Sequence, residues 1–246
     1  MKKVLGCLRR ADNAFDLIQD GDNITVGVSG GKDSMLLLHA LNLYRLFSKK
    51  EYSLHAVCVH LGLKPFDTDA ISRFCAGLGV PLTVIPTQIS KIVFDIRKEK
   101  NPCALCARLR RGALHKAALD LGCNKVALGH NREDALETFL LSLLYEGRLS
   151  IFSPKSFLDR TQLYLIRPFI LLPEKHILSV AKKLRLPVQP SPCPAAGKTK
   201  RQEMKELLFY LAKMVPDVEE KMLGALMNTD TYKLWDKAGS EKDDEP

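Results

Sequence analysis

Short apolar runs alternate with amphipathic segments along most of the chain. The residues ITVGVSGG begin as a β-rich run and end in glycines, and the apolar positions of MLLLHALNLYRLF behind them recur with helical periodicity. The same alternation continues through LHAVCVH, DTDAISRFCAGLG, PLTVIP, CALCARLRRGALHKAALDLG, KVALGH and NREDALETFLLSLLYEG. Alternating strands and helices predict an α/β fold with a doubly wound, mainly parallel sheet. In such sheets, ligands bind beyond the carboxyl ends of the strands.

This alternation weakens after Gly147. SIFSPKSFLDRTQLYLIRPF predicts an irregular hairpin, and LPEKHILSVAKKLRL predicts a helix opened by Pro173. QPSPCPAAGKTKRQ contains three prolines and predicts a loop, followed by two short helices split at Pro216. We therefore expect an N-terminal helix at 1–22, an α/β domain at 23–190, a C-terminal loop with a small helical region at 191–236, and a polar tail at 237–246.

Composition narrows the cellular setting. No apolar run approaches the roughly 20 residues that span a bilayer, and the first lysines are not followed by an apolar signal segment. We expect a cytoplasmic protein with no membrane partner. The formal net charge of +9 favours polyanions such as nucleic acid, although charge alone is weak evidence. Seven cysteines without a secretion signal favour reduced thiols and therefore metal or redox chemistry.

The hexapeptide SGGKDS at residues 29–34 lies where the first strand meets its helix. Backbone amides of a glycine turn at a helix N-terminus can converge on a phosphate. The segment is not a Walker loop, because Asp33 follows Lys32 where that motif needs Ser or Thr. It is also not a GxGxxG fingerprint. The alternative is a glycine turn with N-capping side chains, and the strand–loop–helix context favours the phosphate site over it.

A second motif, GHNRED at residues 129–134, also follows a predicted strand and begins a helix. Two such strand ends can share one ligand. Taken alone, His130 would be interpreted as a capping or core-edge residue, and Glu133 and Asp134 as first-turn acids that interact well with the helix dipole.

Cys103 and Cys106 form a C-x-x-C pair after Pro102, a spacing compatible with zinc, a redox disulfide or an iron–sulfur cluster. Cys193 is the natural third ligand because it lies in the proline-rich, basic loop. Structural zinc normally takes four protein ligands, and either His115 or His176 could be the fourth. The remaining cysteines lie in strand-like or helical contexts, namely Cys7, Cys58, Cys75 and Cys123.

SGGKDS resembles the pyrophosphate loop of the N-type ATP pyrophosphatases, whose fold is of the adenine nucleotide alpha hydrolase type (PP-loop). GHNRED resembles the GHxxDD segment of their tRNA-modifying branch, with Glu133 in place of aspartate. The resemblance implies that ATP is cleaved between its α and β phosphates and that AMP is transferred to a substrate oxygen. It implies catalytic roles for Lys32, Asp33 and Asp134. Asp33 would orient Mg²⁺ or the reacting group. It further implies ligand-binding roles for Ser29, Gly30, Gly31, Lys32, Ser34, Gly129 and His130.

From Ser29 to about Arg201, the motif order is similar to that of the tRNA 2-thiocytidine biosynthesis (tRNA-cytidine 2-sulfurtransferase) family. The segments that match are NPCALCARLRRGAL, KVALGHNREDALETFLLSLLYEG, IRPF and a late cysteine. The resemblance implies a 4Fe–4S cluster on Cys103, Cys106 and Cys193, with one iron free to hold sulfide, and thiolation of an anticodon-loop cytidine in tRNA. It also implies a cysteine desulfurase as sulfur donor, and a homodimer is possible. The chain departs from the family by having a single Cys193 where members often show a further C-x-x-C.

Two kinds of alternative stay open at the level of sequence. One is a different enzyme of the same loop class, either a 2-thiouridine synthetase or a lysidine-type ligase. The other is an inactive iron–sulfur or zinc RNA-binding module. Basic side chains near the cysteines could hold tRNA phosphates or form an ordinary solvated surface. They comprise a first group of Arg108, Arg110, Arg111 and Lys116, and a second group of Lys198, Lys200 and Arg201.

Overall fold

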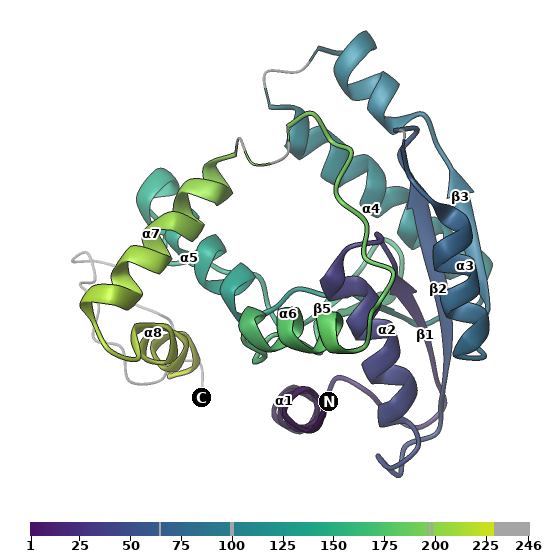
Figure 1. Cartoon of the computed structure of the whole chain (residues 1–246), viewed down its shortest axis with the longest axis horizontal. Coiled ribbons are helices and arrows are strands. Elements are labelled where there is room, and N and C mark those ends of the chain that lie inside the picture. Colours follow the sequence, from purple (N-terminus) through teal and green to yellow (C-terminus); the bar gives the residue numbers. More distant parts are fainter. Residues whose placement is uncertain (64, 99–100, 196, 198, 229–246) are drawn as a thin grey trace, which may run out of the picture.

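A computed structural model describes residues 1–228 except residues 64, 99, 100, 196 and 198. Its centre is a six-stranded sheet in the order β3-β2-β1-β4-β6-β5 (Figure 1). All neighbouring strands are parallel except β5 and β6, which form an antiparallel hairpin at one edge. The strands are β1 (Asp22–Gly27), β2 (Tyr52–His60), β3 (Leu82–Pro86), β4 (Lys125–Ala127), β5 (Lys155–Leu158) and β6 (Leu163–Ile166). The prediction of a doubly wound, mainly parallel sheet is confirmed.

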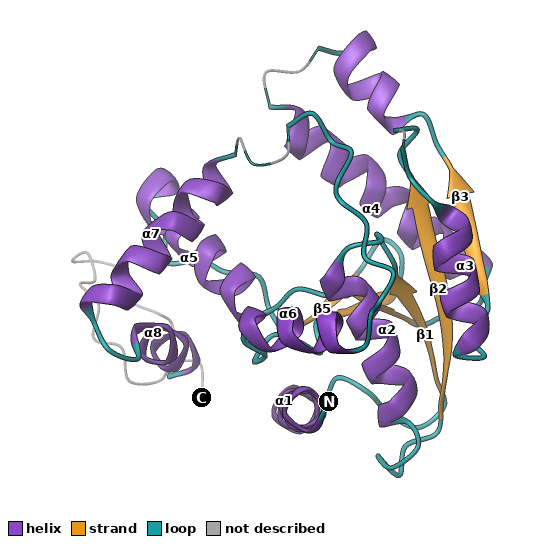
Figure 2. Ribbon diagram, viewed as in Figure 1, coloured by secondary structure: helices purple, strands orange, loops and turns teal. Residues whose placement is uncertain are grey.

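Helices cover both faces of the sheet (Figure 2). They are α1 (Lys2–Phe15), α2 (Lys32–Tyr44), α3 (Thr68–Gly77), α4 (Pro102–Asp120), α5 (Arg132–Glu146), α6 (Glu174–Lys183), α7 (Lys200–Met214) and α8 (Val218–Met227). A short π-helix at Lys91–Ile96 precedes α4 and was not predicted. None of the helices in the described part of the chain has the length and apolarity needed to cross a bilayer.

Alternation along the strands explains why two cores form. Ala56 and Cys58 of β2 point to the core under α1, α2, α3 and α6, whereas Val57 between them points to the core under α4. Successive side chains of a strand lie on opposite faces, so a strand covered on both sides reads as a continuous apolar run. This is why LHAVCVH identifies a buried strand even though its apolar residues do not alternate with polar ones.

The C-terminal helices pack away from the sheet. Leu136 and Leu140 of α5 form a third, smaller core with Met204 and Leu208 of α7, and α8 packs against its edge. The predicted split of this region at Pro216 is seen between α7 and α8. The predicted domain boundaries at residues 22, 190 and 236 stay a prediction, and the tail at 237–246 lies outside the described residues.

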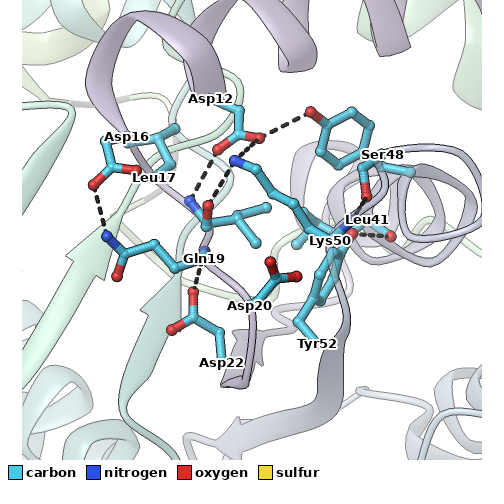
Figure 3. A network of polar contacts seen from close by, with 12 residues as sticks. Asp12, Asp16, Leu17, Gln19, Asp20, Asp22, Leu41, Ser48, Lys50 and Tyr52 are labelled. Atoms are coloured by element: carbon cyan, nitrogen blue, oxygen red, sulfur yellow. Dashed lines mark hydrogen bonds and ion pairs between the residues drawn. The ribbon is translucent and has the colours of Figure 1, made fainter.

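A buried carboxylate fixes α1 to the sheet (Figure 3). Asp12 is 1% exposed, and its Oδ1 accepts the backbone N–H of Ile18 at 2.9 Å. Its Oδ2 accepts from the Tyr44 hydroxyl at 2.8 Å and from Lys50 Nζ at 2.7 Å. Lys50 also donates to the carbonyl oxygen of Ile18 at 2.6 Å. One side chain therefore joins α1, the connection to β1, the end of α2 and the approach to β2.

We expect Asp12→Ala to lower the free energy of unfolding by about 3 kcal/mol, because it leaves a lysine and a tyrosine hydroxyl without their acceptor. Urea denaturation of the two proteins measures the difference. Asp16→Ala is the control, since the side chain of Asp16 is 62% exposed and its ion pair with Lys155 should contribute at most about 1 kcal/mol. Equal losses in the two variants would contradict a special role for the buried carboxylate.

Candidate active site

The turn after β1 has the geometry of an anion site. Gly30 has φ +75°, a conformation that side chains rarely adopt, and Gly31 is the N-cap of α2. Inside the turn, Ser34 Oγ accepts the backbone N–H of Ser29 at 3.1 Å and donates to the carbonyl oxygen of Gly31 at 3.0 Å. The serine hydroxyl thus braces the turn, which leaves the first amides of α2 to face a ligand.

The second motif lies directly against this turn. A Cβ added at Gly129 would lie 3.0 Å from the carbonyl carbon of Asp33 and 3.1 Å from the backbone nitrogen of Ser34, so only glycine allows the two backbones to come this close. Asn131 caps α5 in a capping box with Asp134, and its Nδ2 donates to Asp33 Oδ1 at 3.0 Å. The cap of α5 is therefore Asn131, not His130.

A polar pocket of about 220 Å³ opens beside these two turns. The predicted catalytic residues Lys32, Asp33 and Asp134 all line it. The other residues in its wall are Asn131, Glu133, Glu137, Glu174, Thr199, Arg201, Gln202 and Lys205. It is thus built from the N-terminal ends of α2, α5, α6 and α7, which come from distant parts of the chain (Figure 1).

Lys32 is held at the pocket by two carboxylates. Its Nζ lies 2.8 Å from Asp33 Oδ2 and 2.8 Å from Glu174 Oε1. Burial works to lower the pKa of Lys32, but the hydrogen bonds and charges of Asp33 and Glu174 outweigh it, so the pKa is raised and the ammonium stays charged. Glu174 begins α6 and also pairs with Lys205 at 2.7 Å. A charged lysine at this place suits a phosphate ligand.

Glu137 is a pocket carboxylate that we did not predict. It is 4% exposed, and burial together with the charge of Asp134 raises its pKa to about 7, although Arg201 and Lys205 act in the opposite direction. A sequence signal existed, because Glu137 lies one helical turn after Asp134 and so on the same face of α5. Glu174 carried no such signal, since it reaches the pocket only through the tertiary fold.

His130 packs beside the pocket without lining it. Its ring lies 5.1 Å from the ring of Phe152, and burial, followed by the charges of Arg167 and Arg201, lowers its pKa to about 4. The imidazole is therefore neutral at pH 7. Its Nδ1 is buried and has no hydrogen-bond partner in the part of the chain that the structure describes. The predicted ligand-binding roles of Ser29, Gly30, Gly31, Ser34, Gly129 and His130 stay predictions.

The three predicted cysteine ligands differ from the others in exposure. Cys103 is exposed and Cys106 and Cys193 are half-buried, whereas the remaining four are buried. Burial raises the pKa of Cys58 and of Cys75 to about 11, so these two remain protonated.

Cys193 lies near the C-x-x-C pair in space. The segment between α6 and α7 passes beside the first turn of α4, where Cys103 and Cys106 lie (Figure 1). Burial raises the pKa of Cys106, the charges of Cys193 and Cys103 raise it further, and Arg110 acts to lower it. Within the described residues, no three His, Cys, Asp or Glu side chains are grouped tightly enough to hold a metal ion, including any group with His115 or His176. The ligand set stays a prediction.

The segment that carries Cys193 is attached to the phosphate turn at its start and to the pocket at its end. At its start, the backbone N–H of Gln189 donates to the carbonyl oxygen of Gly30 at 2.9 Å, and its side chain bonds to both the N–H and the carbonyl of Asp67. At its end, Arg201 of α7 reaches Asp134. The cysteine region and the phosphate turn are therefore directly linked through this segment.

The two groups of basic residues have different surroundings. Arg108, Arg110 and Arg111 are exposed on α4 beside the cysteines. Lys200 is also exposed and pairs with Glu203 at 2.9 Å, whereas Arg201 lines the pocket. Lys198 lies outside the described residues.

Comparison with known proteins agrees with this site. Residues 7–205 match the model of the PP-loop domain, which defines the class of protein. A curated tRNA-cytidine(32) 2-sulfurtransferase of Syntrophotalea carbinolica is 38% identical over 96% of this chain and 91% of its own length, and one of Geobacter sulfurreducens is 38% identical over 96% and 93%. The chain therefore belongs to the tRNA-cytidine(32) 2-sulfurtransferase family of PP-loop proteins.

A solved structure shares the fold. The U34-tRNA thiolase NcsA from Methanococcus maripaludis, solved with its [4Fe-4S] cluster, superposes with a TM-score of 0.75 at 24% identity, covering 94% of this chain and 79% of that one. This likeness confirms the PP-loop architecture.

Gly129→Ala should weaken binding of a non-hydrolysable ATP analogue roughly tenfold or more, because the added methyl group must push the phosphate turn out of place. Isothermal titration calorimetry measures the dissociation constant. Gly112→Ala in α4 is the matched control, since a Cβ there meets nothing within 4 Å. If both variants bind like the wild type, the close approach does not shape the site.

Glu137→Gln should change how stability depends on pH. Because folding raises the pKa of Glu137 from an ordinary 4.5 to about 7, the stability linked to its neutral form is complete below pH 4.5 and is lost as the pH rises through 7. Between pH 5 and pH 8, the free energy of unfolding of the glutamine variant should therefore rise relative to that of the wild type by on the order of 1–3 kcal/mol. Urea denaturation at each pH tests this, and a constant difference would contradict it.

Proposed function

We propose that the chain is an ATP-dependent tRNA thiolation enzyme that activates O2 of an anticodon-loop cytidine and replaces that oxygen with sulfur. The observation that carries the proposal is a polar pocket at the phosphate turn and the strand-end motif, in a chain of the tRNA-cytidine(32) 2-sulfurtransferase family that also has three accessible cysteines. ATP binding alone would explain the pocket. The cysteines on α4 and before α7 add the second half of the chemistry.

Activation uses the polar pocket. The cytidine O2 attacks the α phosphorus of ATP, the bond from that phosphorus to its bridging oxygen breaks, and pyrophosphate leaves with the electron pair. Amides at the start of α2 and the charged Lys32 would hold the pyrophosphate, and Asp33 offers the carboxylate oxygen that Mg²⁺ prefers. The product carries AMP on O2, which makes that oxygen a good leaving group when sulfur bonds to C2.

The three cysteines fit an iron–sulfur cluster in their chemistry. All cysteines in the described part of the chain are free thiols, and these three are the accessible ones. The charges of Cys103 and Cys193 both act on the Cys106 thiol. Cys103, Cys106 and Cys193 would hold a 4Fe–4S cluster, which when bound would hold the sulfide used in the second step. A cysteine desulfurase as sulfur donor, a homodimeric assembly and a cytoplasmic location complete the proposal.

The exposed arginines of α4 support tRNA as the substrate. Arg108, Arg110 and Arg111 lie on the helix that carries Cys103 and Cys106, where they can pair with phosphates on either side of a loop base. A single-stranded loop suits the reaction, because stacking and pairing would hide O2 and C2 of the cytidine. We propose cytidine 32, the position in the name of the relatives, as the target.

Two variants should separate activation from sulfur insertion. With a tRNA transcript carrying cytidine at position 32, Lys32→Met should lower pyrophosphate release at least 100-fold, because the pocket loses its central cation. Cys193→Ala, reconstituted without oxygen, should keep pyrophosphate release but lose both its iron and the formation of 2-thiocytidine. Malachite-green detection of phosphate after pyrophosphatase treatment and mass spectrometry of digested tRNA measure the two steps.

Cys123→Ala is the control for this experiment. Cys123 is buried in the core beneath α4, so the variant should carry out both steps. Thermal melting checks that each variant is folded. A Cys193→Ala protein that keeps its full iron load and thiolates tRNA would remove Cys193 from the ligand set. A wild-type protein that makes a different modified base would favour one of the other PP-loop enzymes.

A further inference from the structure

The start of α7 forms a wall of the pocket that the phosphate turn does not account for. Thr199 caps α7 by accepting the backbone N–H of Gln202, and both residues line the pocket with Arg201 and Lys205. These residues follow the Cys193 segment and line the same pocket as Lys32 and Asp33. The nucleotide site is therefore bounded by a helix from the C-terminal region as well as by the sheet.

Arg201 is held in this wall by acidic and hydroxyl groups. Its Nη1 lies 3.2 Å from Asp134 Oδ1 and 3.7 Å from Glu137 Oε2, and its Nη2 donates to Thr138 Oγ1 at 3.1 Å. Its side chain is 43% exposed, so the guanidinium borders the open pocket. A guanidinium has five N–H donors in a planar fork, which matches the oxygens of a phosphate group.

Acidic side chains outnumber basic ones in the wall of the pocket. Five carboxylates and three cations line it, the cations are paired with those carboxylates, and Glu133 also pairs with Arg132. Burial, followed by the charge of Asp134, disfavours the charged form of Glu137. ATP with Mg²⁺ would bring both a cation for the carboxylates and phosphate oxygens for the cations, so partners can be exchanged with little net change in pairing.

The other cations near the pocket are less suited to a new role. Arg132 is 3% exposed, does not line the pocket, and is held by Glu133, Glu219 and Glu220. Lys200, the neighbour of Arg201, points outward to Glu203 and the ring of Tyr145. Arg201 alone offers a guanidinium that lines the pocket and remains partly exposed among the described residues.

We infer that Arg201 is a catalytic residue that leaves Asp134 and Glu137 to bind the polyphosphate of ATP and neutralises the charge that develops on pyrophosphate as it leaves. The inference rests on the proposed function. The α phosphorus gains a bond to the cytidine O2 and loses its bond to the bridging oxygen, whose electron pair stays on pyrophosphate. Arginine at such a leaving group acts by charge stabilisation and exchanges no proton, because a guanidinium is not deprotonated in proteins.

Arg201→Met, Arg201→Lys and Lys200→Met test this assignment. At saturating ATP and with the tRNA transcript, Arg201→Met should lower the rate of pyrophosphate release roughly 100-fold, and it should weaken binding of a non-hydrolysable ATP analogue about tenfold. Arg201→Lys should recover part of both losses, because it restores charge without the planar fork. Lys200→Met removes one positive charge from the next position, outside the pocket, and should leave binding of the analogue unchanged.

Arg201→Met proteins that bind the analogue and release pyrophosphate like the wild type would overturn the inference and reduce Arg201 to a link between α7 and α5. Arg201→Lys proteins with fully wild-type values would overturn the role assigned to the guanidinium, because a point charge would then serve as well as the planar fork. A wild-type protein that releases no pyrophosphate with tRNA would contradict the proposed function instead. Binding of the analogue, measured by calorimetry, would still decide the role of Arg201, and equal affinities would reject it.

Discussion

The close approach of two backbone turns is the constraint on which the rest of the site depends. β1 and β4 are neighbours in register, with Val26 beside Ala127, so both chains leave the sheet at the same level. The missing side chain of Gly129 lets the second turn rest directly on the backbone of Asp33 and Ser34. From this contact follow the hydrogen bond between Asn131 and Asp33 and the position of Asp134. A parallel sheet thereby converts two distant sequence motifs into one polar pocket.

Each cation in the wall of the pocket pairs with carboxylates. Lys32 and Lys205 share Glu174, and Arg201 pairs with Asp134 and Glu137. Such pairs keep buried charges compensated. Under the proposed function, phosphate oxygens would replace carboxylates as partners of these cations, so binding would need little reorganisation. Burial, followed by the charge of Asp134, raises the pKa of Glu137.

Local patterns predicted the fold well, because strand and helix periodicity are encoded by neighbouring residues. The phosphate turn could be found because a strand, glycines and a helix start follow one another in SGGKDS. The pocket wall contributed by Glu174 and Arg201 could not, since nothing in either segment indicates which helix end it will face. The π-helix at Lys91–Ile96 escaped prediction because its hydrogen-bond pattern has no distinct apolar period. Pro173 did indicate where α6 begins, and thereby the place of Glu174 along the chain.

The segment that carries Cys193 has an entropic consequence. Gln189 attaches its start to Gly30, and Arg201 attaches its end to Asp134, so the chain between them is a closed loop of limited reach. Closing that loop limits the positions that Cys193 can reach, which lowers the entropy that it would lose on joining Cys103 and Cys106 in the proposed cluster site. This would act as a chelate effect, in which the proposed third thiol has a high effective concentration at the other two. Contacts at Gly30 and Asp134 would then set how readily the three proposed ligands assemble.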